Sequence, residues 1–111
     1  MESGKLSHAR DVINQGLVGS PDSKRLRATR AILLYKLGQR EQSFEAFEEL
    51  YGPSAAHHNL AVLDVDAGTI DSAVKHAKLA TQYQDCSSKA IELNDALQVR
   101  LASAAPSRVI R

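Results

Sequence analysis

Metal coordination is the first chemistry to consider, because His57 and His58 stand together and two carboxylates, Asp64 and Asp66, follow about two helical turns later. Imidazole and carboxylate groups are ordinary zinc ligands. On a helix, however, adjacent side chains point about 100° apart, and His57 and Asp64 lie roughly 10 Å apart along the axis. One ion cannot reach both without a further element. We therefore predict no metal site and no cofactor.

The single cysteine, Cys86, is the one candidate thiol nucleophile. A catalytic thiol needs a base beside it, and no histidine lies near Cys86 in the sequence. The chain also has no phosphate-binding loop, no Ser/His/Asp arrangement and no pair of carboxylates in a credible cleft. We predict that Cys86 is a structural thiol, that the fold does not depend on a disulfide, and that the protein is not an enzyme.

A short basic run, with Lys24, Arg25, Arg27 and Arg30, is the feature that could bind nucleic acid. On a helix these four side chains spread around the cylinder, and no glycine-aromatic pattern accompanies them. The net charge of the whole chain is only +1. A nucleic-acid accessory domain therefore stands as an alternative, not as the main prediction.

The composition is that of an ordinary soluble globular protein, with 43% apolar and 24% charged residues in 111. This length corresponds to one domain with a modest core. No stretch approaches the ~20 apolar residues of a membrane span, and the first twenty residues lack the apolar middle of a signal peptide. We expect a cytoplasmic protein, although a leader removed beforehand would leave no trace in this sequence.

Helical spacing of apolar residues runs through almost the whole chain, and no stretch alternates long enough to predict a strand. Gly38, Gly52 and Gly68 are expected to end helices, Ser20 and Thr69 to cap them, and Pro106 to close the last one. The sequence predicts an all-α fold with a frayed segment 1–5, one helical domain over 6–104 and a loose tail 105–111. The expected helices are 6–18, 21–37, 39–51, 54–67, 69–84 and 87–104.

The chain repeats itself. Gly38 and Gly68 each precede a small residue by five positions, and those small residues are Ser43 and Ala73. Four positions further on come Phe47 and Ala77. In-phase recurrence of this kind is the signature of a repeat architecture.

These residues resemble the tetratricopeptide repeat (TPR) family, whose pattern places W-x₂-L-G-x₂-Y before A-x₃-F. Leu60-Ala61 corresponds to L-G and Ala73-x₃-Ala77 to A-x₃-F, and the likeness covers roughly residues 6–84. It implies an α-solenoid of antiparallel helix hairpins, with about two full repeats and flanking helices. The departures are charged or polar: Arg27 and His57 stand where tryptophan is usual, Arg30 where leucine is usual, and Asp64 where tyrosine is usual.

The resemblance also implies a concave groove lined by the first helix of each hairpin, where a peptide or helix of a partner binds. In this groove Ile32 and Val62 would be apolar anchors within a polar rim. Asn59 matches one residue of the carboxylate clamp that some TPR proteins carry, but Ala28 and Ile32 cannot donate to a carboxylate, so no such clamp is expected. The helical offsets place the following residues in the groove: Arg25, Thr29, Ile32, Lys36, His58, Asn59, Val62 and Asp66.

We therefore predict a non-catalytic scaffold or adaptor that binds a protein partner of unknown identity. One alternative is a structural, self-associating segment of a larger helical-repeat assembly, because a short array can dimerise or belong to a longer protein. The nucleic-acid accessory domain is the other alternative.

Overall fold

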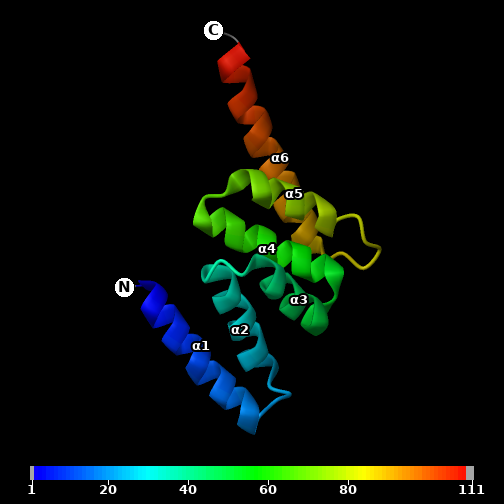
Figure 1. Cartoon of the computed structure of the whole chain (residues 1–111). Coiled ribbons are helices and arrows are strands. Elements are labelled where there is room, and N and C mark those ends of the chain that lie inside the picture. The colour runs from blue at the N-terminus through cyan, green and yellow to red at the C-terminus, as the bar shows by residue number, and fades with distance from the viewer. Residues whose placement is uncertain (1, 110–111) are drawn as a thin grey trace. The chain divides into compact units, whose positions relative to one another are not determined.

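The computed structural model describes residues 2–109, with side chains over residues 4–102, and this part of the chain consists of helices joined by short turns and loops (Figure 1). The six helices confirm the predicted all-α class, and the described residues form no strand. No helix in this range is both long and apolar enough to cross a bilayer. The helices are α1 (Glu2–Gly19), α2 (Lys24–Lys36), α3 (Arg40–Tyr51), α4 (Pro53–Ala67), α5 (Ile70–Ala80) and α6 (Ser88–Val109).

The chain divides into two compact units, Met1–Ala56 and His57–Arg111. Its length predicted a single domain, but in a helical-hairpin protein most contacts join neighbours in sequence, so separate units are a natural outcome. The first unit holds α1, α2, α3 and the first turn of α4. The second holds the rest of α4 with α5 and α6.

The start of α2 differs from the prediction. Ser20 was expected to cap this helix, but the N-cap is Ser23, whose hydroxyl accepts a hydrogen bond from the Leu26 amide at 3.2 Å. The Ser20 amide instead donates to the carbonyl of Gly16 and so finishes α1. Both serines can cap a helix. A turn begins at Ser20, in which the Ser23 amide donates to the Ser20 carbonyl at 3.1 Å, so α2 starts only after this turn and Ser23 is its N-cap.

The outer helices are longer than predicted. Helix α1 already begins at Glu2, so residues 2–5 are helical. Helix α6 runs through Pro106 to Val109, so this proline does not end the helix as predicted. Residues 110 and 111 of the expected tail lie outside the described residues. In contrast, α5 is shorter than predicted and ends at Ala80.

The two glycine turns predicted to be equivalent have the same geometry. Gly38 and Gly68 both have φ of +84°. The residue after each glycine donates its amide five positions back, Gln39 to Leu34 and Thr69 to Asp64, both at 2.9 Å. Each glycine amide bonds three positions back, at 3.0 and 3.1 Å. This pair of bonds is the Schellman motif, in which a left-handed residue satisfies the last helical carbonyls.

In the first unit, α2 packs between α1 and α3. The helices α2 and α3 approach closely because a small residue lies between them: Ser43 is fully buried, and its hydroxyl donates to the carbonyl of Ala31 at 2.7 Å. Phe47 and Leu34 are buried in this unit as well.

The buried cluster of the second unit consists mainly of alanines. Ala61 of α4 and Ala73 and Ala77 of α5 form one buried cluster with Leu97 of α6. Ala61 and Ala73 are completely inaccessible to solvent. Small residues at both positions allow α4 and α5 to lie in close contact, as the hairpin prediction requires. Helix α6 lies against α5 (Figure 1). Its Leu97 belongs to the buried cluster, and Leu93 packs against it.

Candidate functional site

The predicted row on α2 lies on its solvent side. Arg25, Thr29, Ile32 and Lys36 are all exposed, whereas Ala31, Leu33 and Leu34 point into the first unit. Ile32 leaves 36% of its surface exposed in the middle of this row. The Thr29 hydroxyl donates to the Arg25 carbonyl at 2.9 Å, so it is already partly satisfied within the helix. The row is therefore an apolar side chain between two cations.

The predicted row on α4 is less open. Val62 is 40% exposed and Asp66 is exposed, but His58 and Asn59 are half-buried. Burial lowers the pKa of the His58 imidazole below its ordinary value of 6.5, and the positive charge of Lys89 lowers that pKa further. His58 Nδ1 is buried and has no hydrogen-bond partner among the described residues. In the second unit, therefore, only Val62 and Asp66 of the four residues are openly available.

The histidines and carboxylates considered as metal ligands are not brought together as one set. His57 pairs with a residue that the sequence analysis did not consider, His76 of α5, with 3.0 Å between the two Nδ1 atoms. Asp64 is fully buried, and its Oδ1 accepts a hydrogen bond from the Thr69 hydroxyl at 3.1 Å. Among residues 2–109 no group of three or more potential ligands is placed to hold a metal ion.

Cys86, the other reactive side chain that was considered, is a half-buried free thiol. Its amide donates to the carbonyl of Tyr83 at 3.2 Å, which places it in the segment between α5 and α6. Nothing in its described surroundings arranges a base beside it.

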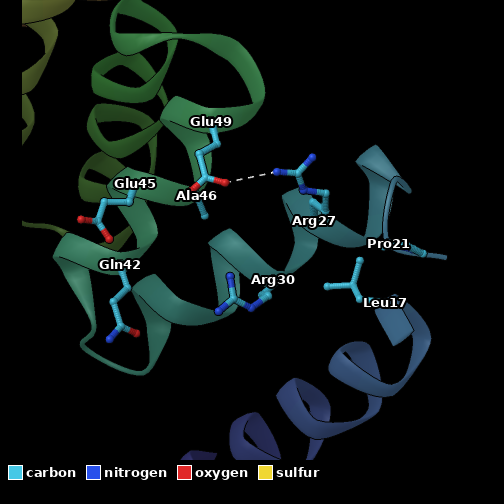
Figure 2. A pocket seen from close by; sticks show the side chains of 8 residues that line it. All are labelled: Leu17, Pro21, Arg27, Arg30, Gln42, Glu45, Ala46 and Glu49. Atoms are coloured by element: carbon cyan, nitrogen blue, oxygen red, sulfur yellow. Dashed lines mark hydrogen bonds and ion pairs between the residues drawn. The ribbon is translucent and has the colours of Figure 1, made fainter. Parts of the chain in front are cut away.

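The first unit contains a pocket of about 460 Å³ that the sequence analysis did not predict (Figure 2). It lies between the end of α1, the first turns of α2 and one side of α3. None of the residues around it is a histidine, cysteine or serine, so the pocket offers groups for binding but no nucleophile. Its lining residues are Leu17, Pro21, Arg27, Arg30, Gln42, Glu45, Ala46 and Glu49.

Two of the four charges in this pocket compensate each other. Figure 2 shows Arg27 reaching across to Glu49, with 3.3 Å between the guanidinium and the carboxylate. Arg30 and Glu45 make no ion pair with any described residue. The guanidinium of Arg30 can therefore donate to an added acceptor such as a carboxylate or a carbonyl, and Glu45 can accept from an added donor.

A sequence signal for this pocket existed. Arg27 and Arg30 are three positions apart and fall on the side of α2 that also carries Leu34, so they had to point toward α3. Glu45 and Glu49 are four positions apart on α3 and supply opposite charges there. The resemblance to the repeat family marked Arg27 and Arg30 as departures, but it gave no reason to expect an open space beside them.

Comparison with known proteins adds no family to this description. No protein-family model, no curated protein and no solved structure matches the chain. The described residues and their geometry are thus the whole basis for a functional conclusion.

Proposed function

We propose that this protein is a non-catalytic interaction module that binds a segment of a partner protein along the exposed side of α2. The observation that carries the proposal is Ile32, a large apolar side chain that is 36% exposed on a helix whose other side is packed. Arg25 and Lys36 lie on the same row at either end. An apolar centre with a polar rim is the ordinary composition of a protein-binding surface.

In this proposal Ile32 supplies the apolar contact and the two cations set the preference for the partner's charge. A segment with an apolar residue between acidic residues would match the row. Buried apolar area contributes about 25 cal/mol per Å², so one isoleucine cannot bind a partner tightly. The pocket beside Arg30 would add a second contact for a polar side chain of the same or another segment.

We further propose that the two hairpins, α2–α3 and α4–α5, are successive units of a TPR-like helical repeat. The equivalent turns at Gly38 and Gly68 and the equivalent buried positions of Ser43 and Ala73 support this. In such a repeat, Val62 on α4 corresponds to Ile32 on α2, thirty positions earlier (62 − 32). The second hairpin would then present Val62 and Asp66 in the same way.

The test needs a binding probe that does not depend on knowing the partner. A random peptide library displayed on phage is selected against the whole chain, and the enriched peptides are synthesised and titrated by fluorescence anisotropy. Ile32→Glu is expected to weaken binding at least tenfold, because it places a charge at the apolar centre. Lys36→Ala is expected to weaken the binding of acidic peptides about two- to fivefold, as for a rim charge.

A matched control is available in the second unit. Ile91 of α6 is 45% exposed, so Ile91→Glu makes the same chemical change at a similar exposure. It should leave peptide binding unchanged, as should Asn59→Ala if the α2 row is sufficient. Failure to enrich any peptide, or equal binding by the Ile32→Glu and Ile91→Glu variants, would count against the proposal.

Self-association is a second candidate function, favoured by the apolar surface of α6. Ile91 is 45% exposed, and Val99, eight positions further and therefore on the same side of the helix, is 64% exposed. A second copy of the chain could cover these side chains. Sedimentation velocity from about 5 to 500 µM would then show a concentration-dependent mass that Ile91→Glu or Val99→Glu abolishes and Ile32→Glu does not.

A further inference from the structure

The open end of the α4–α5 hairpin carries a pair of histidines in direct contact. His57 stands near the start of α4 and His76 in the second half of α5, and their Nδ1 atoms are 3.0 Å apart in a partly buried site. Their ring centroids are 5.2 Å apart, and the ring planes differ by 27°. The Tyr83 ring stacks with the His57 ring, with centroids 6.2 Å apart and planes that differ by 25°.

The distances distinguish a hydrogen bond from a metal site. A five-membered ring with bonds of about 1.33 Å places each atom about 1.1 Å from its centroid. Two rings that point their Nδ1 atoms at each other across 3.0 Å then have centroids about 5.3 Å apart. A metal bound at about 2.05 Å to both nitrogens would instead need an N–metal–N angle of about 94° and centroids about 4.7 Å apart. The observed 5.2 Å matches the direct N–H···N hydrogen bond.

This arrangement limits how many protons the two Nδ1 atoms can hold. A neutral imidazole has one nitrogen that donates and one that accepts, whereas an imidazolium only donates. One Nδ1–H between the rings makes the bond, whether the ring that carries it is neutral or cationic. Protonation of both rings leaves two N–H groups and two positive charges facing each other at 3.0 Å.

We propose that the His57–His76 pair is a proton-sensitive clasp, which holds the open end of the α4–α5 hairpin while one Nδ1 carries a hydrogen and the other does not, and releases it when both rings are protonated. The other end of the hairpin is fixed by the Gly68 turn and the alanine cluster, so release affects the ends of α4 and α5 selectively. The proposal does not depend on the peptide-binding function.

The described titratable groups around the clasp are an imidazole, a phenol and a lysine whose charge acts on that imidazole. On α4, the adjacent His58 is a second imidazole, and the charge of Lys89 on α6 reaches it. From the segment after α5, Tyr83 stacks on His57.

The direct test is NMR of the whole chain with ¹⁵N-labelled histidine, between pH 8 and pH 4.5. A scalar coupling across the hydrogen bond is expected between the Nδ1 atoms of His57 and His76 at pH 7.5, and it should vanish as the second ring is protonated. His58→Gln is the matched control, because it removes the neighbouring imidazole and should leave the coupling intact. His76→Phe should abolish it.

Stability provides a second measurement. If the unfolded chain binds one more proton than the clasp allows, the unfolding equilibrium constant rises about tenfold for each pH unit below imidazole's ordinary range. In His76→Phe the unfolding equilibrium constant should rise about tenfold less over each pH unit. Thermal midpoints of wild type should not rise with equimolar Zn²⁺, Cu²⁺ or Ni²⁺. Absence of the coupling at pH 7.5, its persistence with both rings protonated, or a metal-induced rise lost in His76→Phe would each overturn the proposal.

Discussion

Replacing Gly38 and Gly68 by alanine should destabilise the two hairpins by the same amount. Both glycines have φ of +84°, a conformation that glycine adopts freely and that L-residues with a Cβ avoid. A Cβ built on either glycine would meet no atom within 4 Å. The cost of alanine is therefore purely conformational, and the two positions differ in nothing else that matters for it.

The expected cost is about 1–2 kcal/mol at each position, the penalty of the left-handed conformation for an L-residue. A stability slope of about 1 kcal/mol per molar urea is reasonable for a small unit. Each substitution should thus lower the urea midpoint of its own unit by roughly 1–2 M. Asparagine tolerates positive φ better than alanine does, so Gly38→Asn and Gly68→Asn should cost clearly less.

Urea titration followed by ¹H–¹⁵N NMR gives the assay, because amides of α3 and of α5 report their own hairpins separately. Gly38→Ala should lower the urea midpoint reported by the α3 amides. Gly68→Ala should lower the midpoint reported by the α5 amides. Gly19→Ala is the control, since its added Cβ also meets nothing within 4 Å but its φ is not positive. It should be neutral or slightly stabilising. Unequal shifts in the two hairpins, or equal costs for alanine and asparagine, would refute the reasoning.

Three further outcomes are expected. Ser43→Ala should cost about 1 kcal/mol in urea unfolding, because it removes the buried hydrogen bond to the Ala31 carbonyl and leaves no donor unsatisfied. Either Arg27→Ala or Glu49→Ala should cost at most about 0.5 kcal/mol, and less in 1 M salt, because the Glu49 side chain is 69% exposed. His58→Gln should reduce the loss of stability between pH 7.5 and 5.5. The pKa of folded His58 is lowered, so the unfolded chain takes up this proton first as the pH falls through 6.5. A smaller loss of stability in wild type than in the variant would contradict this sign.

Much of the fold was predictable because it depends on local signals. A glycine with positive φ ends a helix through its own backbone, and Gly38 and Gly68 do so with identical bonding. The buried positions of Ala61 and Ala73 also followed, since only small residues allow two helices such closeness. The capping serine of α2 was missed because Ser20 and Ser23 have equal intrinsic tendencies, and the turn between them decides which one starts the helix.

The candidate site was less predictable because it depends on distances between helices. The exposed row on α2 followed from helical periodicity alone, and all four residues are exposed. The contact of His57 with His76 joins residues 19 positions apart, and no local pattern specifies which two side chains of neighbouring helices meet. The neighbouring residue His58, selected for the groove, is instead half-buried with an unpartnered Nδ1.

The thirty-residue offset of the proposed repeat relates the pocket of the first unit to the histidine pair of the second. Arg27 and His57 are equivalent by this offset, and each reaches from the first helix of its hairpin to the second, Arg27 to Glu49 and His57 to His76. The residue equivalent to His76 is Ala46, which lines the pocket. In the second hairpin the His76 imidazole contacts His57 at the open end. In the first hairpin the equivalent position holds only the Ala46 methyl group, and the Arg27–Glu49 ion pair connects the two helices instead. In the proposed repeat, the same position therefore carries an imidazole of the histidine pair in the second hairpin and a methyl group beside an open pocket in the first.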